Sequence, residues 1–479
     1  MLSLQKVVRE HEQIKFSSNI LKRKIRTIFF MSIHPTSNLN EPDFKHRFFQ
    51  LSVVNILSNL MVPLSGLVDM AFLGHLAEIR HLAGVALAAV LFSYIYWTFG
   101  FLRMGTTGTT AQAVGRSDPD AVLLAGLRNG LLALSLGLTI LILQHPLREL
   151  GFALLNATPE VKASGRAYYD ALIWGAPATL LNFVLMGWFL GREQGGKVWL
   201  LSAVANGGNV VLDYLFMMQW GWESAGAGAA TAASQYLILL VGIILVRSEG
   251  WFSQVSRVSF RIFERDAMLA NFKLNKDILV RTLALISTFA VFTNLSAGLG
   301  TLVLATNTLL LKVVSLAAHF IDGLAFATES FAGIFQGKND QQKQANLLRM
   351  SCGVSLGLGL TFATVFIVFP NSIFQLLTNH LDVIEGIQAD VVWLIPVLGF
   401  GSIAYILDGY FLGLTEGRIL RTSMVLSAIF GFAPWVIAAW QFRSNQMLWL
   451  GLSSFMAART ITLGLQVPKT LIDNREFVD

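Results

Sequence analysis

Long apolar stretches separated by short polar segments follow one another from about residue 46 to the C-terminal end of the chain. A helix needs about 20 such residues to cross a hydrocarbon core about 30 Å thick. Single segments cross as helices, because lipid cannot hydrogen-bond an open backbone. The pattern therefore predicts an all-α integral membrane protein with twelve transmembrane helices, near residues 46–74, 82–113, 121–145, 163–191, 198–219, 225–246, 278–300, 304–335, 351–369, 388–413, 420–440 and 446–467.

Short motifs in the first half recur 222 residues further on. Residues 187–195 match 409–417, and 115–118 match 337–340. Six spans precede the central polar segment and six follow it, so both halves enter the membrane in the same direction. Such a parallel repeat predicts two pseudo-symmetric six-helix lobes. The expected division is a cytoplasmic basic tail (1–44), an N-lobe with spans 1–6 (45–247), a cytoplasmic linker (248–277), a C-lobe with spans 7–12 (278–470) and a C-terminal tail (471–479).

Composition supports a membrane protein and sets its orientation. The chain is 54% hydrophobic and 13% charged, with a net charge of +6. Lys and Arg are concentrated in alternate loops, which predicts that both termini are cytoplasmic in a multi-pass protein of the cell membrane. The positive charge is thus a topology signal, and no nucleic-acid partner is expected. The single cysteine, Cys352, cannot form a disulfide framework or a thiolate metal site.

Two carboxylates lie inside predicted spans of the first half, Asp69 in span 1 and Asp213 in span 5. Counting from the outer ends of their spans places both about 10 Å below the outer surface. Asn209 lies one turn below Asp213 on the same helix face, and Thr231 in span 6 has a matching depth. These oxygens predict a site for Na⁺, and two mutually repelling carboxylates could instead carry a proton. The alternative is a buried hydrogen-bonded network that only joins helices.

The second half carries a different set of charged residues inside its predicted spans: Lys312, Asp322, Glu329, Asp408 and Arg459. By the repeat offset, Glu329 corresponds to Thr107, one turn from Arg103 in span 2. A salt bridge or gate between Arg103 and Glu329 is one expectation, and pairing of Glu329 within its own lobe, with Lys312 or Arg459, is the other. Asp322 and Asp408 are expected to shape the substrate path or to stabilise helix contacts.

Proline adds one candidate moving part. Pro63 lies six residues before Asp69 in span 1. Inside a helix, proline removes a backbone hydrogen bond and favours a kink. We therefore expect Pro63 to act as a hinge next to the cation site.

Several segments form recognisable motifs. They are Asn59-Leu60-Met61-Val62-Pro63-Leu64-Ser65-Gly66-Leu67-Val68-Asp69, Phe101-Leu102-Arg103-Met104-Gly105-Thr106-Thr107-Gly108, Asp213-Tyr214-Leu215 with Asn209 before it, Ile321-Asp322-Gly323-Leu324-Ala325 and Leu407-Asp408-Gly409. At these residues the chain resembles the multidrug and toxic compound extrusion (MATE) family, specifically its DinF branch. The resemblance covers nearly everything after residue 45.

This resemblance implies an antiporter that exports drugs, toxins or metabolites by alternating access, in exchange for H⁺ or Na⁺. In relatives the cation site lies in the N-lobe, and its residues fall on Asp69, Asn209, Asp213 and Thr231 here. Other branches carry a carboxylate in span 7, but residues 282–301 contain none, which puts that kind of C-lobe coupling in doubt. The expected partners are a small amphipathic, cationic substrate, the coupling cation and the bilayer; no other cofactor is expected, and the chain is expected to be a monomer.

Two alternatives remain at this stage. A flippase or exporter of lipid-linked or secondary-metabolite cargo would share the two-lobe plan and would have a polar or basic cleft. A membrane-embedded enzyme would need clustered His, Asp or Glu at a membrane face, such as H-E-x-x-H, and the sequence has no such cluster. We therefore expect a transporter and no enzyme. The residues do not decide between H⁺ and Na⁺.

Overall fold

The computed structural model describes residues 41–75 and 78–471, which are almost entirely helical and contain no strand. Most of the predicted tail 1–44 and of the tail 471–479 lies outside these residues. The N-lobe comprises α2 (Glu41–Gly74), α3 (Ile79–Phe99), α4 (Phe101–Gly115), α5 (Pro119–Ile142), α6 (Gln144–Ala153), α7 (Pro159–Leu172), α8 (Ala176–Gly191), α9 (Gly195–Asp213) and α10 (Glu223–Ser248).

A short helix, α11 (Phe252–Val258), leads from the N-lobe into the C-lobe. The C-lobe comprises α12 (Arg265–Leu299), α13 (Thr301–Gly337), α14 (Gln341–Val368), α15 (Pro370–Phe374), α16 (Leu381–Asp390), α17 (Leu394–Gly413), α18 (Gly417–Leu426), α19 (Ala433–Phe442), α20 (Asn445–Gly464) and α21 (Val467–Thr470). Five single-turn or irregular segments join them: Ile173–Gly175, Tyr214–Gln219, Ser259–Arg261, Val391–Trp393 and Ser427–Phe432.

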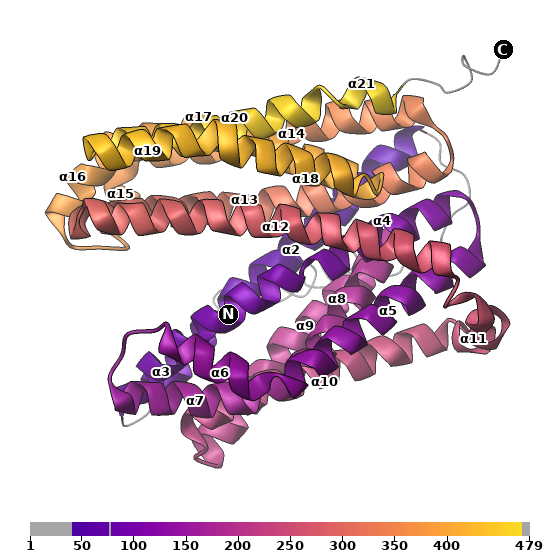
Figure 1. The fold of residues 1–479 in the computed structure, drawn as a ribbon, viewed down its shortest axis with the longest axis horizontal. Helices are drawn as coiled ribbons and strands as arrows, with labels where there is room; N and C mark the ends of the chain where they lie inside the picture. The colour runs from indigo at the N-terminus through magenta and orange to yellow at the C-terminus, as the bar shows by residue number, and fades with distance from the viewer. Residues whose placement is uncertain (1–40, 76–77, 472–479) are drawn as a thin grey trace, which may run out of the picture.

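The two lobes form two groups of helices (Figure 1). They lie together at the end that carries α11 and α21, and they diverge toward the end that carries α3, α7, α15 and α16. Contacts between the lobes are made mainly by α13, which packs on α2 and α4, and by α12, which packs on α4. The molecule therefore has a closed end and an open end.

The predicted spans are confirmed. Twelve helical stretches within the described residues are long and apolar enough to cross a membrane, and they coincide with the predicted ones to within several residues at most boundaries. The largest difference is span 7. It belongs to α12, which begins at Arg265, inside the segment 248–277 that the sequence assigns to the linker.

The internal repeat extends to individual backbone angles. Ser117 and its counterpart Asn339 both have a positive φ, at 56° and 54°, in the turns that end α4 and α13. In both turns the residue that follows donates its backbone N–H to a carbonyl five positions earlier and then caps the next helix with its carboxylate. Glu193 and Thr415 form a second matched pair, at 56° and 58°. Left-handed residues of this kind close helices by satisfying the last carbonyl groups.

Glycine explains why the motif 187–191 recurs at 409–413. A Cβ on Gly187 would lie 2.4 Å from the carbonyl oxygen of Arg103, so α8 packs directly on the backbone of α4. Its counterpart Gly409 would meet the carbonyl of Ala325 at 2.5 Å, so α17 packs on α13 in the same way. Small residues allow such close approach between membrane helices. The repeated glycines thus build the same crossing in each lobe.

Glycine also forms the contact between the lobes at the closed end. A Cβ on Gly115 would lie 2.2 Å from the carbonyl oxygen of Ile334, and one on Gly337 would lie 2.2 Å from that of Gln112. Gly115 and Gly337 are repeat counterparts and touch each other across the lobes. We call this contact between α4 and α13 the glycine seam.

The prolines differ in their effect on the helices. The helices that contain Pro177, Pro396 and Pro434 are each preceded by an irregular turn, at 173–175, 391–393 and 427–432. α2 instead runs as one helix through Pro63. The expected hinge at Pro63 is therefore not a break in this conformation, and its movement stays a prediction.

Candidate functional site

Four N-lobe residues predicted to form a cation site come from three helices that pack on one another. Asp69 lies on α2, Asn209 and Asp213 lie on α9, and Thr231 lies on α10. Helix α9 contacts both α2 and α10. Asp213 is the last residue of α9, and a π-helical turn, Tyr214–Gln219, follows it directly. Such turns are frequent at functional sites because they redirect the side chains beside them.

Hydrogen bonds through Asn209 join these three helices. Its Oδ1 accepts a hydrogen bond from Ser65 of α2 at 3.1 Å, and its Nδ2 donates to the hydroxyl of Thr231 at 3.4 Å. Asp69 and Asp213 interact directly through their carboxyl groups. The structure thus brings all four predicted residues into one cluster, which we call the N-lobe site.

Tyr168 of α7 belongs to the same cluster, although the sequence did not predict it. It is buried, and its hydroxyl lies beside that of Thr231 and close to Asp69 and Asp213. The search for intramembrane charges passed over it because its side chain is neutral. The one available signal was the pair of neighbouring tyrosines, Tyr168 and Tyr169, near the start of the predicted span 163–191.

The two carboxylates of the N-lobe site have no cationic partner among the described residues. Asp213 is 1% exposed, and neither of its carboxylate oxygens has a hydrogen-bond partner of standard geometry; the same holds for Oδ1 of Asp69. Two adjacent carboxylates in a low-dielectric interior repel each other. The pair is therefore suited to hold a proton or a cation. Carboxylate, amide and hydroxyl oxygens are the ligand types that hard cations take.

The C-lobe carboxylate Asp408 has the opposite environment. It lies on α17 and pairs with Arg281 of α12 and with Arg459 of α20, and all three side chains are at most 6% exposed. Arg459 also lies over the ring of Tyr405, at 5.3 Å from its centroid. We call Arg281, Asp408 and Arg459 the C-lobe triad. It joins three helices and leaves Asp408 neutralised.

Arg281 was missed as an intramembrane residue. It lies three residues into the predicted span 7, and its charge was counted with the cytoplasmic end of that span. The packing of α12 against α17 places its side chain against Asp408. Lys312, one of the expected partners of Glu329, is exposed on α13 instead.

Arg103 and Glu329 form an ion pair between the lobes. Nη1 of Arg103 on α4 lies 3.4 Å from Oε2 of Glu329 on α13. The guanidinium also lies over the ring of Phe326, at 3.8 Å. Glu329 is 1% exposed, and Thr107, its own repeat counterpart, lies in hydrogen-bonding contact with it. Asp322 on α13 lies within electrostatic range of Arg103, Arg281 and Asp408.

A second group of charges lies at the closed end, where Glu193 and Lys338 stand outside the spans and Arg47 lies near the start of the first span. Nη2 of Arg47 on α2 is 2.6 Å from Oε2 of Glu193. Burial raises the pKa of Glu193 above its usual range, and Arg47 opposes part of that shift. Lys338 of the C-lobe lies close to Glu193, and burial lowers the pKa of its ammonium group. These contacts lie beside the glycine seam.

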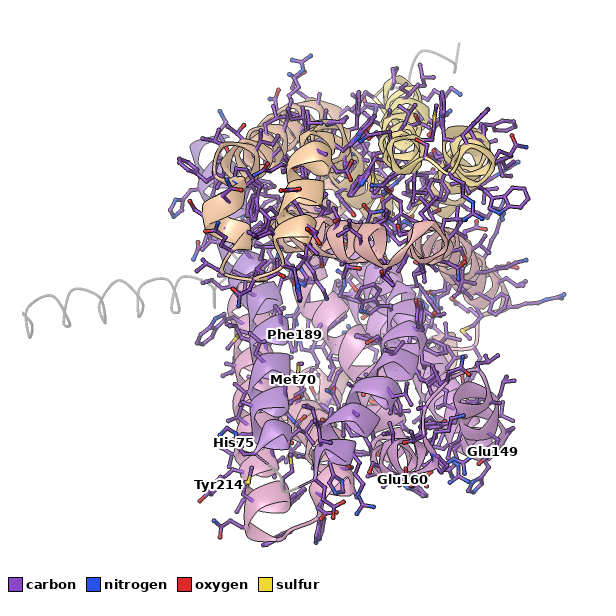
Figure 2. The ribbon with its side chains drawn as sticks, turned by 90° about the vertical axis from the view of Figure 1, so that its left-hand side faces the viewer. Met70, His75, Glu149, Glu160, Phe189 and Tyr214 are labelled. Carbon is purple, nitrogen blue, oxygen red and sulfur yellow. The ribbon has the colours of Figure 1, made fainter. Side chains whose placement is uncertain are left out.

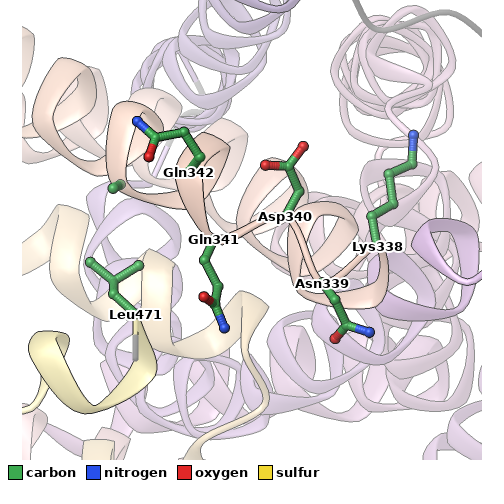
Figure 3. Close-up of a pocket in the computed structure, with 7 residues that line it drawn as sticks. Lys338, Asn339, Asp340, Gln341, Gln342 and Leu471 are labelled. Carbon is green, nitrogen blue, oxygen red and sulfur yellow. The ribbon is translucent and has the colours of Figure 1, made fainter. Parts of the chain in front are cut away.

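The open end is marked by residues toward the ends of N-lobe helices that lie far from the glycine seam. Figure 2 shows Met70 and His75 along α2, with Tyr214 near them, at a distance from the C-lobe. A shallow polar depression at the opposite end is lined by Lys338, Asn339, Asp340, Gln341, Gln342, Ala345 and Leu471 (Figure 3). Because it contains none of the predicted site residues, we do not assign it to the transport path.

Comparisons with known proteins agree with this architecture. A model of the MatE family matches residues 55–215 and 278–437, one segment in each lobe. The chain is 33% identical over 423 residues to DNA damage-inducible protein F of Escherichia coli K12, covering 87% of this chain and 90% of that protein. It is 23% identical over 366 residues to a probable multidrug resistance protein NorM of Thermotoga maritima, covering 72% and 74%.

Solved structures share the fold. One is described as the outward-facing conformation of a multidrug resistance MATE family transporter of the MOP superfamily; it has a TM-score of 0.79 and 19% identity, and the match covers 89% of this chain and 96% of that one. A MOP superfamily transporter from Pyrococcus furiosus has a TM-score of 0.77 and 19% identity, with the same coverage.

Proposed function

Because this chain belongs to the MatE family of membrane transporters, we propose that it is a cation-coupled antiporter that exports small amphipathic compounds. The observation that carries the proposal is the N-lobe site. Within the part of the chain that the structure describes, Asp69 and Asp213 interact without a cationic partner, beside three neutral oxygen donors, Asn209, Thr231 and Tyr168. A proton or Na⁺ bound there would relieve the repulsion between the carboxylates.

Coupling requires that the ion and the substrate favour different conformations. A ligand shifts a conformational equilibrium only by its differential affinity for the two states. In our proposal the outer side loads the ion at the N-lobe site, and the substrate loads from the cytoplasmic side after the closed end has opened. The elements that must separate for this are the glycine seam and the pair Arg103–Glu329. Pro63 is the candidate bend in α2.

We propose that the closed end faces the cytoplasm, with both termini on that side. Support comes from the concentration of Arg and Lys in the turns and the linker at that end, which follows the positive-inside rule. This orientation gives the open end, and with it the outer ends of α2 and α9, access to the external medium. Ions at the higher external concentration would then reach Asp69 and Asp213 first.

The test is transport by the purified protein in proteoliposomes, with either a pH gradient or a Na⁺ gradient imposed. We expect uphill movement of an amphipathic cation such as a fluorescent dye under one of the two gradients. Asp69→Asn should lose this coupling. Asp382→Asn is the matched control, because Asp382 is an exposed carboxylate on α16 of the other lobe. Dye transport whose rate depends on neither gradient would contradict the proposal.

A further inference from the structure

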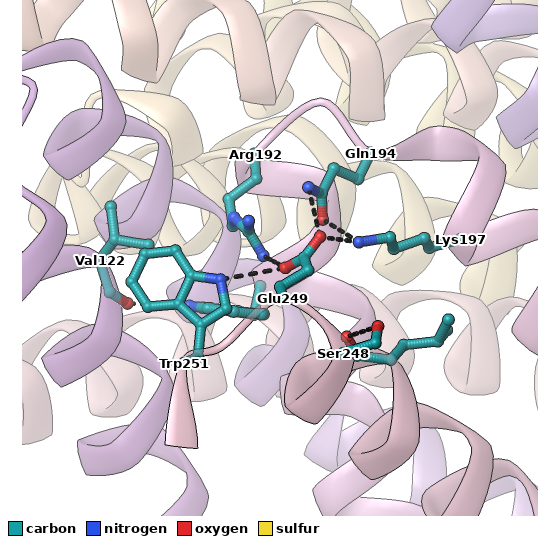
Figure 4. A network of polar contacts seen from close by, with 9 residues as sticks. Val122, Arg192, Gln194, Lys197, Ser248, Glu249 and Trp251 are labelled. Atoms are coloured by element: carbon teal, nitrogen blue, oxygen red, sulfur yellow. Dashed lines mark hydrogen bonds and ion pairs between the residues drawn. The ribbon is translucent and has the colours of Figure 1, made fainter. Parts of the chain in front are cut away.

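The segment that joins the two lobes is fixed to the N-lobe through one of its faces. Glu249 accepts hydrogen bonds from Arg192 at 2.8 Å and from Gln194 at 3.0 Å (Figure 4). It also pairs with Lys197 and accepts the indole N–H of Trp251 at 3.0 Å. Arg192 is held between two indole rings, and burial lowers the pKa of its guanidinium to about 10, so it stays charged at neutral pH. We call residues 249–264 the docked linker.

The rest of the docked linker is held in the same way. Val258 is fully buried against Leu123 and Leu124 of α5. Arg128 of α5 donates hydrogen bonds to the backbone carbonyls of Arg261, at 2.6 Å, and Ile262, at 3.1 Å. The inner side of the linker is therefore part of the N-lobe.

The outer side of the docked linker is both aromatic and basic. Phe252, Phe260 and Phe263 are 51%, 78% and 70% exposed. The basic side chains beside them belong to Arg257 and Arg261, which are 58% and 40% exposed, and to Arg265, the exposed residue that directly follows the docked linker. Arg257 contacts Asp120 and Arg261 contacts Glu264, but exposed pairs of this kind are weak and leave the guanidinium groups available. We call these six residues the linker face.

The position of the linker face determines what can cover it. The docked linker starts directly after α10 and ends directly before α12, and both are membrane spans. It therefore lies at the membrane surface. Aromatic rings and arginine side chains together are suited to the boundary between headgroups and acyl chains, where the rings enter and the guanidinium groups bind phosphate. Each basic residue near an anionic surface adds about 1 kcal/mol of attraction.

We propose that the linker face binds anionic lipids of the leaflet on its side of the membrane. Its phenylalanines enter the interface, and its arginines bind the lipid phosphates. Arg265 is the first residue of α12, and α12 continues without a break into the C-lobe. Lipid bound at the linker face consequently contacts both lobes. It contacts the docked linker, which is fixed to the N-lobe, and Arg265, which begins a C-lobe helix. Anionic lipid thereby influences how easily the lobes move against each other.

Cys352 is the only cysteine of the chain, so a probe can be placed at one position. We would replace Cys352 by Ala, introduce Phe263→Cys, attach a nitroxide and measure its depth in vesicles. The vesicles contain phosphatidylcholine alone or phosphatidylcholine with phosphatidylglycerol. The expected result is a nitroxide at the acyl boundary with phosphatidylglycerol and a shallower one without it. Arg116→Cys, on the exposed turn between α4 and α5, is the control and should stay in water.

Replacing Arg257, Arg261 and Arg265 together by Gln should remove the effect of phosphatidylglycerol on probe depth. It should also weaken phosphatidylglycerol binding to the purified protein, measured by native mass spectrometry, by roughly fivefold for each charge. The matched control removes three charges elsewhere at the same end, Arg116→Gln with Arg349→Gln and Arg418→Gln, and should change binding less.

Three results would overturn the proposal. One is a nitroxide that stays in water in both kinds of vesicle, and another is equal depth in both. The third is a nitroxide that becomes more buried as the protein-to-lipid ratio rises. That result would mean that a second copy of the chain, and not lipid, covers the linker face. If Phe263→Cys does not fold, Phe260→Cys provides the same measurement.

Discussion

The two lobes place carboxylates inside the membrane in opposite electrostatic environments. In the N-lobe, Asp69 and Asp213 lie against each other with neutral neighbours. In the C-lobe, Asp408 is held by Arg281 and Arg459. An intramembrane carboxylate is costly in either case. In the C-lobe the arginines offset that cost permanently, whereas in our proposal a mobile cation does so for the N-lobe pair. The partner of a carboxylate, more than its depth, therefore indicates whether it binds an ion.

The strongest test of this comparison is the charge of Asp69. Asp69→Asn is nearly isosteric and removes only the ionisable group. We expect gradient-driven efflux to fall to the rate of passive leak, with normal folding on size-exclusion chromatography. Initial efflux rates in proteoliposomes provide the measurement. Coupled transport at the rate of the unmodified protein would remove Asp69 from the mechanism.

The second test concerns the C-lobe triad. Asp408→Asn leaves Arg281 and Arg459 uncompensated in the interior, and breaking a buried pair costs about 3–5 kcal/mol. We expect a lower melting temperature and a lower yield, and an unchanged dependence of the remaining transport on pH or Na⁺. Asp322→Asn should also lower rate or expression without moving that dependence. If only these C-lobe changes shift the pH or Na⁺ midpoint of transport, coupling lies in the C-lobe and our assignment is wrong.

A rescue sharpens this second test. Replacing all three members of the C-lobe triad by apolar residues of similar size, Arg281→Met, Asp408→Leu and Arg459→Met, should recover stability, since apolar replacements of buried ion clusters are often neutral or stabilising. The corresponding change in the N-lobe site, Asp69→Leu with Asp213→Leu, should recover no coupling. Transport coupling that is lost in the stable triple variant would give the C-lobe triad an active role.

Asp213 should alter coupling without abolishing it. Because the two carboxylates interact, they titrate as one unit. We expect Asp213→Asn to move the pH or Na⁺ midpoint of transport by about one pH unit or its equivalent in concentration. Combined with Asp69→Asn, its effect should not be additive. Additive effects in the double variant would show that the carboxylates act independently.

The ion pair between the lobes should give a smaller effect. Arg103→Glu places two acidic groups together, and Glu329→Arg in the same chain restores opposite charges. We expect the single change to slow transport and the second change to restore part of it, with a coupling energy of about 1–2 kcal/mol. Efflux rates of both single variants and the double variant complete the cycle. A double variant no faster than Arg103→Glu would argue against a gate.

The smallest effect is expected at Tyr168. Tyr168→Phe keeps the ring and removes one neutral oxygen donor from the N-lobe site. We expect a shift of the ion midpoint by about 0.7 pH unit or less, since a single hydrogen bond contributes roughly 1 kcal/mol. Tyr169→Phe is the control, because the hydroxyl of Tyr169 donates to the backbone carbonyl of Gln144 and points away from the site. Equal shifts in both variants would exclude a specific role for Tyr168.

Sequence reasoning succeeded where periodicity and charge determine the outcome. Span lengths and the repeat offset predicted the twelve helices, and counting residues along spans 1, 5 and 6 brought Asp69, Asp213 and Thr231 together. It failed where a contact depends on helix packing. Tyr168 is neutral and therefore carries no charge signal, and the contact of Arg281 with Asp408 depends on how α12 packs against α17. The pairing of Arg103 with Glu329 stayed open because sequence distance does not tell which helices meet.

The glycine seam also has a consequence for the origin of the chain. Gly115 and Gly337 are counterparts in the repeat, and they touch each other. In a symmetric dimer of two identical half-length chains, one glycine on the two-fold axis would meet its own copy, as in any isologous interface. Any other residue close to the two-fold axis would also face its own copy. An acidic residue there would therefore be repelled by its copy in the partner chain. Once two halves are joined in one chain, Thr107 and Glu329 can occupy that position as an unlike pair, and a contact that two-fold symmetry would make identical on both sides becomes a directional one.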